Sequence, residues 1–274
     1  MHWVLESNIT DFGYQWLIKV LERYGIEHTF VKVVPNQNIL IEPEFDTFKF
    51  EPQLSDNIDI HADKIFAFGS MGLSRVATER GWVPGSFFNE EFTFEKWSSG
   101  FGLSNLLNEK SIIQKFSDNL PEELSGQMFI RPCEDNKAFA GQIFNRDKFL
   151  NWQQKVISIN DRMAKLNADT MIAIAPYQDI LSEARMIIID GQYVTGSYYK
   201  IGASIEYHKV ESGDPVIEYT QSVVEKYQPA EAFVVDIALT KQGYKIIEIN
   251  NINSVGLYMV DVEKFVQAMM KKFA

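Results

Sequence analysis

Cysteine, basic residues and long apolar runs are scarce in this 274-residue sequence. Cys133 is its only cysteine, so no disulfide can form within the chain and a thiolate metal cluster is excluded. The neighbouring residues Pro132 and Glu134 carry no positive charge that would lower the thiol pKa. We therefore expect Cys133 to be a partly buried, unreactive thiol rather than a nucleophile.

No apolar run approaches the roughly 20 residues that a membrane-spanning helix needs. Residues 1–11 also lack the basic start and the long apolar stretch of a signal peptide. We therefore expect a cytoplasmic protein without a membrane partner.

Basic side chains are outnumbered by acidic ones. The sequence has 26 Lys and Arg residues against 37 Asp and Glu residues, which gives a formal net charge of -11. Such a surface repels the phosphates of nucleic acids and argues against general nucleic-acid binding. A local basic pocket for a nucleotide is compatible with it.

The N-terminal third alternates between strand and helix patterns. Runs rich in apolar and β-branched residues predict strands, and apolar residues at helical spacing predict the helices between them. The expected elements are strands over His2–Glu6, Thr29–Val34 and Lys64–Phe68 and helices over 12–24 and Ser70–Arg80. This order predicts an α/β domain with a small parallel sheet covered by helices.

The second half follows a different pattern, in which hairpin strands are grouped around single helices. Residues 85–125 predict a linker with one or two helices. The polar stretch over residues 204–214 predicts either a loop that covers the substrate or a disordered loop. The expected strands and helices after residue 127 are Met128–Arg131, Ala140–Phe144, Asp147–Ile157 (helix), Thr170–Ala175, Ala184–Ile189, Tyr193–Tyr199, Val216–Tyr227 (helix), Ala232–Leu239, Tyr244–Ile249 and Val262–Phe273 (helix). The pattern predicts an α+β domain rather than a doubly wound sheet.

Oxygen-bearing side chains end two of these strands. Asp236 lies within one apolar strand, and Glu248 and Asn250 end the next. Residues two apart on a strand project from the same face, and a hairpin turning at 241–243 places Asp236 opposite them. Such a set suits Mg²⁺, which binds ATP phosphates at the same time. The alternative is an amphipathic hairpin whose polar residues merely face solvent.

This arrangement of Asp236 followed by the Glu248-x-Asn250 triplet resembles the metal-binding signature of ATP-grasp ligases. The resemblance implies ATP and Mg²⁺ as cofactors. It also implies a pre-ATP-grasp α/β domain over residues 1–95 and an ATP-grasp domain over residues 96–274. The two lobes of that domain, about 96–175 and 176–274, would hold ATP between them.

The resemblance extends upstream to residues that would contact ATP phosphates. Arg131, in the FIRP stretch, stands where many members carry lysine. Lys137 stands in a loop that is glycine-rich in many relatives, whereas this loop has only Gly141. Phosphate binding would therefore rely on the Lys137 charge. A solvated loop lysine is the alternative.

A hinge strand over IAPYQDILSEAR resembles the adenine-reading segment of the family. By this resemblance Tyr177, Gln178 and Asp179 face the adenine, and Glu183 takes the ribose hydroxyls.

Arg185 and Lys200 complete a basic set with Lys137. This set resembles that of the ATP-grasp clade named for one arginine and two lysines. The clade is related to RimK-like carboxylate–amine ligases. The resemblance gives Arg185 and Lys200 catalytic contacts with phosphates or with the acyl intermediate. Surface ion pairs are the alternative for both.

The implied activity is ATP-dependent ligation, in which a substrate carboxylate becomes an acylphosphate and an amine displaces the phosphate. The amine or acid would be an amino acid, a peptide or a modified nucleoside. A phosphotransferase and a catalytically silent nucleotide-binding module are the alternatives.

A competing phosphate site is the turn at 69–72, Gly-Ser-Met-Gly, which precedes a predicted helix. The sequence leaves the oligomeric state open.

Overall fold

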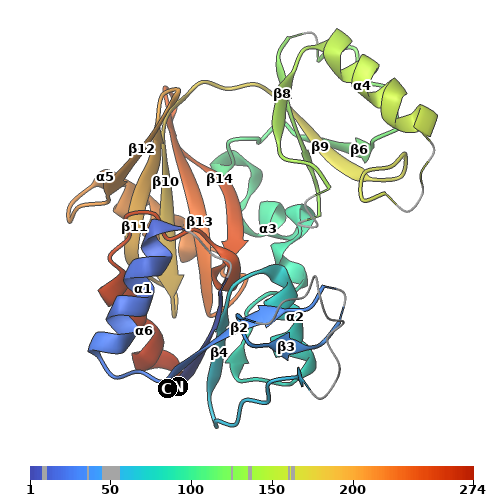
Figure 1. The fold of residues 1–274 in the computed structure, drawn as a ribbon. Helices are drawn as coiled ribbons and strands as arrows, with labels where there is room; N and C mark the ends of the chain where they lie inside the picture. The colour runs from blue at the N-terminus through green and yellow to red at the C-terminus, as the bar shows by residue number, and fades with distance from the viewer. Residues whose placement is uncertain are drawn as a thin grey trace. The chain divides into compact units, whose positions relative to one another are not determined.

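The structure is a computed structural model that describes residues 1–7, 11–35, 37–44, 56–124, 126–134, 138–159, 161 and 164–274. The chain forms two compact units, shown in Figure 1 with its elements labelled. The first unit comprises Met1–Asn89, Ser182–Ile237 and Glu248–Ala274, and the second comprises Glu90–Leu181 and Ala238–Ile247. Among the described residues, no helix is long and apolar enough to cross a lipid bilayer.

The first unit begins with the predicted small sheet, which is parallel except for β3, whose pairing with β2 is antiparallel. Its strand order is β3-β2-β1-β4-β5, and β1 pairs in parallel with both β2 and β4. The strands span β1 (His2–Glu6), β2 (His28–Val33), β3 (Leu40–Ile41), β4 (Ile65–Phe68) and β5 (Pro84–Gly85). The short strands β3 and β5 were not predicted, because two residues are too few to give a hydrophobic period.

Both faces of this sheet are covered by helices. Val4 and Ala67 face one side, where they pack against α2 (Met71–Glu79). Trp3 and Phe66 face the other, where α1 (Phe12–Arg23) and α6 (Val262–Phe273) lie. Alternate side chains of a strand point to opposite faces, so a strand buried on both sides is apolar throughout.

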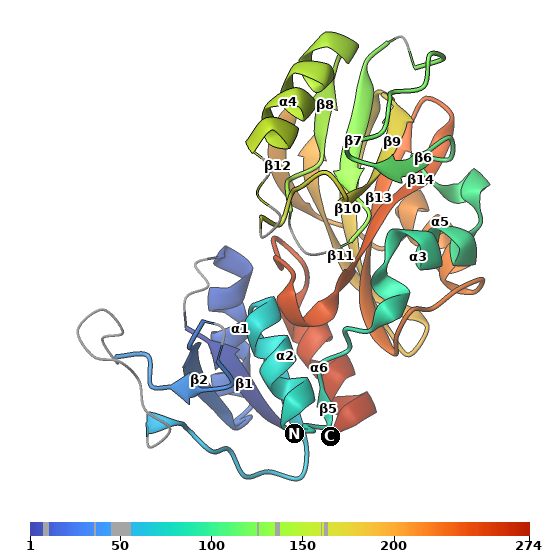
Figure 2. The same cartoon turned by 90° about the vertical axis from the view of Figure 1, so that its right-hand side faces the viewer.

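Helices α1 and α6 lie side by side in the first unit and join its two sheets into one core (Figures 1 and 2). Their buried side chains share a cluster with Ile187, Ile189 and Val234 of the second sheet. The N- and C-termini also lie together in both views. The first and last segments of the chain are therefore folded against each other.

The second sheet has the strand order β12-β11-β10-β13-β14. Its strands span β10 (Ile180–Ile189), β11 (Gln192–Ile201), β12 (Ser204–Lys209), β13 (Ala232–Thr240) and β14 (Gly243–Asn251). Asp190 and Gly191 both have positive φ, of 53° and 71°, as a tight hairpin turn between β10 and β11 requires. Helix α5 (Pro215–Val224) packs against β11.

Residues 204–214 do not form the predicted loop throughout, because Ser204–Lys209 is the strand β12. Every side chain of β12 is exposed, since the strand pairs only with β11 at the edge of the sheet. A strand exposed on both faces has no alternating apolar pattern. The prediction failed for that reason.

The second unit contains a four-stranded antiparallel sheet with the order β6-β9-β7-β8. Helix α4 (Arg146–Ile159) lies along it in both views, and Phe149 packs there against Phe116 and Phe144. The strands span β6 (Ile112–Lys115), β7 (Met128–Pro132), β8 (Gln142–Phe144) and β9 (Met171–Pro176). The region predicted as a linker contains one α-helix, α3 (Phe94–Phe101), and also the unpredicted β6.

Asn253, two residues after the end of β14, connects this part of the chain to the first sheet. Its fully buried side chain donates to the carbonyls of Ala67 (2.6 Å) and Gly85 (2.9 Å). It also accepts a hydrogen bond from the Phe87 amide at 2.9 Å.

We predict that Asn253→Ala lowers the free energy of unfolding by about 3 kcal/mol, because it leaves three buried backbone groups without partners. Urea unfolding followed by circular dichroism measures the loss. Asn119→Ala, at an exposed position, is the control. Equal unfolding midpoints for the two variants would contradict the role given to Asn253.

Candidate functional site

Six polar residues gather on neighbouring strands of the second sheet, all within the first unit. They are Glu183 and Arg185 of β10, Lys200 of β11, Asp236 of β13, and Glu248 and Asn250 of β14. All six were singled out in the sequence, by their spacing on strands or by the resemblance. The strand order β11-β10-β13-β14 brings these strands together.

The structure brings together the three residues predicted to bind a metal. The Asn250 side-chain amide lies 3.2 Å from Asp236 Oδ2 and 3.2 Å from Glu248 Oε1. In this orientation its Nδ2 donates to both carboxylates. A half-turn of the amide would direct Oδ1 toward the same point and produce a set of three oxygen donors.

These donors fit Mg²⁺, which is commonly bound by one or two carboxylates and completed by waters and substrate phosphates. Among the residues that the structure describes, no group of three or more His, Cys, Asp or Glu side chains is arranged to hold a metal. A cation at Asp236 and Glu248 would therefore depend on Asn250 and on ligands from outside the protein. The assignment of the three residues to a metal stays a prediction.

Asp236 also makes a buried, two-pronged ion pair with Arg185. Arg185 Nε lies 3.0 Å from Asp236 Oδ1, and Nη2 lies 2.8 Å from Oδ2. Nη1 donates to the Gly256 carbonyl at 3.2 Å. Both side chains are almost fully buried, so neither charge has water as an alternative partner. Burial disfavours the charged guanidinium, but the Asp236 carboxylate outweighs it and raises the pKa of Arg185.

Lys200 pairs with Glu183 on the neighbouring strand. The Lys200 Nζ lies 2.6 Å from Glu183 Oε1, and the two residues are opposite each other in the β10–β11 register. With the residues described above, the cluster holds three carboxylates and two cations. Its formal charge is therefore one unit negative when all five are ionised, which favours an added cation.

Two tyrosines flank the Arg185 guanidinium and were not predicted. The ring centroids of Tyr199 and Tyr258 lie 5.7 Å and 4.9 Å from Arg185 Cζ. Burial raises the pKa of both phenols, so they stay neutral at physiological pH. Tyr258 has a positive φ of 47°, which is uncommon for a residue with a bulky side chain. Its ring also stacks on Tyr207. Nothing in the local sequence distinguishes these tyrosines from core aromatics.

The three residues predicted to face adenine, Tyr177, Gln178 and Asp179, lie in the second unit directly after β9. Tyr177 donates its backbone N–H to Gln127 at 2.9 Å. Gln178 Nε2 donates to the Leu107 carbonyl at 2.8 Å, and Asp179 Oδ2 lies 3.7 Å from Lys241 Nζ. The segment is therefore held in place by both its backbone and its side chains. Its contact with adenine stays a prediction.

Of the two predicted phosphate-binding residues upstream, Arg131 lies on β7. Its guanidinium lies over the rings of Phe94 and Trp97, at 5.8 Å and 5.9 Å from their centroids. Lys137 lies outside the described residues.

Cys133, the residue after β7, is buried. Burial together with the nearby Glu95 raises its thiol pKa to about 12, which agrees with the expected unreactive thiol.

The competing phosphate site at the start of α2 is filled by the protein's own side chains. Ser70 Oγ accepts hydrogen bonds from the amides of Gly72 (3.1 Å) and Leu73 (3.4 Å). The buried Glu6 carboxylate accepts from the Ser70 amide at 2.6 Å. A phosphate at this helix end would meet a carboxylate at close range, so the turn is a poor anion site.

Comparison with known proteins points to one family. A family model for the ATP-grasp domain, family 2 of the clade named for one arginine and two lysines, matches residues 107–268. The matched segment contains every candidate nucleotide- and metal-binding residue named above. No curated protein matches the chain in sequence.

Solved structures resemble the whole chain. D-cycloserine synthetase DcsG is similar with a TM-score of 0.60 at 11% identity, over 99% of this chain and 99% of that one. A D-alanine–D-alanine ligase from Bacillus anthracis, complexed with ATP, also has a TM-score of 0.60, at 12% identity over 98% and 95%. A RimK domain ATP-grasp protein from Sphaerobacter thermophilus has a TM-score of 0.60 at 10% identity over 93% and 92%. These likenesses show the ATP-grasp fold.

The buried Arg185–Asp236 pair predicts a non-additive pattern of stability. Removing one partner leaves an uncompensated charge, so Arg185→Met and Asp236→Leu should each cost about 3–5 kcal/mol of unfolding free energy. The double variant has no buried charge at this position and should cost less than the sum of the two. Urea unfolding of all four proteins measures the coupling. Additive losses would contradict a dominant pairwise interaction.

Proposed function

This chain belongs to family 2 of the ATP-grasp clade named for one arginine and two lysines, and on that premise we propose that it is an ATP- and Mg²⁺-dependent ligase. The proposed reaction converts a substrate carboxylate into an acylphosphate, which an amine then attacks. The observation that carries the proposal is the cluster in which Asp236, Glu248 and Asn250 converge beside Arg185 and Lys200.

The metal-binding role falls to Asp236, Glu248 and Asn250. When bound there, Mg²⁺ would neutralise charge on the ATP phosphates and favour transfer of the terminal phosphoryl group. The protein's own part is to hold the three side chains in place. Arg185 orients Asp236 through two hydrogen bonds, so the carboxylate is positioned before any ligand arrives.

The two cations of the cluster are proposed to stabilise developing negative charge. Arg185 is permanently charged and immobile, because Asp236 and the Gly256 carbonyl hold its guanidinium. Lys200 is more exposed and makes one ion pair, so its ammonium can exchange Glu183 for a phosphate or acylphosphate oxygen. A fixed charge such as that of Arg185 lowers a barrier without reorganisation during the reaction.

The remaining assignments rest on the family resemblance. Glu183 is proposed for the ribose hydroxyls, Tyr177, Gln178 and Asp179 for adenine, and Arg131 and Lys137 for phosphates. Since the competing turn at 69–72 is occupied by Glu6, it offers no alternative phosphate site in the first unit.

Ligase activity is favoured over two alternatives. The similar solved structures named above include one named a synthetase and one named a D-alanine–D-alanine ligase. A silent nucleotide-binding module would not need a convergent pair of acids with an amide. A phosphotransferase would use the same cluster, so only the reaction itself separates it from a ligase.

We predict that Glu248→Gln abolishes ATP turnover while the protein stays folded, because the change removes one of two carboxylate ligands at nearly constant shape. ADP formation is measured with Mg²⁺ across a panel of amino acids, peptides and modified nucleosides. Glu225→Gln, which removes the same charge at an exposed position, should keep wild-type turnover.

Unchanged ATP consumption in Glu248→Gln would defeat the metal assignment. ADP formation that requires both a carboxylate and an amine identifies a ligase. ADP formation with a single substrate, accompanied by a stable phosphorylated product, would identify a phosphotransferase instead. Nucleotide binding without turnover under any of these conditions would favour the silent module.

A further inference from the structure

A pocket of about 370 Å³ lies in the first unit, lined by the start of α1 and by the chain that leads into α6. Its apolar walls include Phe12 and Trp16 of α1 and Met259 and Val260 from the connecting segment. Phe12 is 61% exposed and Trp16 42%, which is high for large aromatic side chains. The volume is at the lower end of the range for small-molecule sites, roughly 300–1,000 Å³.

The wall formed by residues 258–263 is hydrogen-bonded to β11. The amide of Met259 donates to Ser197 Oγ at 3.2 Å, and the amide of Asp261 donates to Thr195 Oγ1 at 2.8 Å. Both acceptor side chains are buried. On the α1 side, a Cβ at Gly13 would lie only 2.6 Å from Leu257 Cβ, so glycine permits the close approach of helix and segment. The pocket is thus a fixed feature of the fold.

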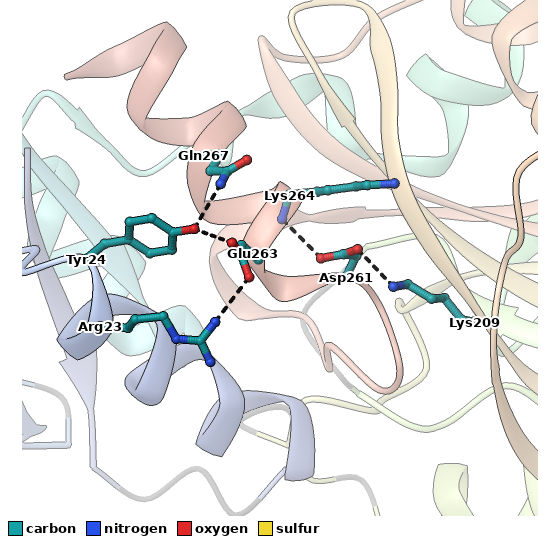
Figure 3. A network of polar contacts seen from close by, with 7 residues as sticks. All are labelled: Arg23, Tyr24, Lys209, Asp261, Glu263, Lys264 and Gln267. Carbon is teal, nitrogen blue, oxygen red and sulfur yellow. Dashed lines mark hydrogen bonds and ion pairs between the residues drawn. The ribbon is translucent and has the colours of Figure 1, made fainter.

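The charged residues at the pocket neutralise each other. Figure 3 shows two ion pairs there: Arg23 Nη1 lies 3.3 Å from Glu263 Oε2, and Lys209 Nζ lies 2.8 Å from Asp261 Oδ2. Tyr24 adds a hydrogen bond to Glu263, and the other oxygen of Asp261 caps α6. Two positive and two negative charges leave no net attraction for an ion. The pocket therefore suits an uncharged, apolar group.

Tyr258 connects this pocket to the reaction site. It lines the pocket, and its ring also lies 4.9 Å from Arg185 Cζ. The carbonyl of Gly256, in the same segment, accepts a hydrogen bond from Arg185. A group in the pocket is therefore one tyrosine ring away from the charged cluster. A matching ligand has an apolar part for the pocket and a charged part for the cluster.

We infer that the pocket binds the apolar side chain of an amino-acid substrate, either a free amino acid or the end residue of a peptide, with an aromatic or large aliphatic side chain. This inference rests on the proposed ligase function. The side chain would cover Phe12 and Trp16, and the charged main-chain groups would face the Arg185 cluster. A side chain of this kind fits within the pocket volume of about 370 Å³.

The test compares probes that differ only in the side chain. Phenylalanine, leucine and alanine are used, free and as dipeptides with alanine at either end. ADP formation is measured with Mg²⁺, a carboxylate panel and an amine panel. We expect kcat/KM for the best phenylalanine or leucine probe to exceed that of its alanine counterpart by at least about 10-fold, since even one methylene in an apolar pocket changes selectivity by roughly 10–200-fold.

Met259→Trp should fill the pocket and remove that preference, so that the phenylalanine and leucine probes are used no better than the alanine probe in this variant. Val83→Trp introduces the same side chain at an exposed position of the first unit outside the pocket and should keep the preference. Affinity for a non-hydrolysable ATP analogue, measured by calorimetry, should be equal in both variants and the wild type.

Two failures are distinguishable. If the protein forms ADP but uses phenylalanine and leucine probes no better than alanine probes, or if Met259→Trp keeps the preference, the inference about the pocket is wrong and the ligase proposal stands. If the wild type neither binds the ATP analogue nor forms ADP with any probe, the proposed function itself fails, and the inference fails with it.

Discussion

The buried ion pair between Arg185 and Asp236 is the interaction on which the site depends. It joins neighbouring strands β10 and β13 and fixes both a candidate metal ligand and a permanent positive charge. Burying two charges is costly, and only close, two-pronged geometry offsets that cost. Such a pair is weak evidence for stability by itself. It is well suited to a site where a carboxylate and a cation must keep fixed positions around phosphate groups.

The end of β14 and the segment that follows it contact several parts of the first unit. Glu248 and Asn250 face the cluster, whereas Asn253 turns to the first sheet and hydrogen-bonds to β4 and β5. The Gly256 carbonyl then accepts a hydrogen bond from Arg185, and Tyr258 borders both the cluster and the apolar pocket. A short stretch of chain therefore connects the candidate site to the N-terminal sheet and to the proposed substrate pocket.

Local patterns predicted most elements of the first unit and the convergence of Asp236, Glu248 and Asn250. Periodicity predicts a buried strand or a helix, and a hairpin turn brings its two strands into register. Contacts between segments that are distant in the sequence could not be predicted from these local patterns. Arg185 meets Asp236 only because β10 lies beside β13, and Glu6 blocks the 69–72 turn only because β1 pairs with β4. The exposed strand β12 and the unusual backbone of Tyr258 carry no sequence period at all.

The central claim is that Asp236, Glu248 and Asn250 hold the Mg²⁺ that accompanies ATP. A crystal structure with Mg²⁺ and a non-hydrolysable ATP analogue tests it most directly. We predict an octahedral metal at about 2.1 Å from oxygens of Asp236 and Glu248, with the Asn250 amide oxygen turned toward it and phosphate oxygens completing the shell. A metal and triphosphate bound elsewhere, with the Asn250 amide still donating to both carboxylates, would contradict the account.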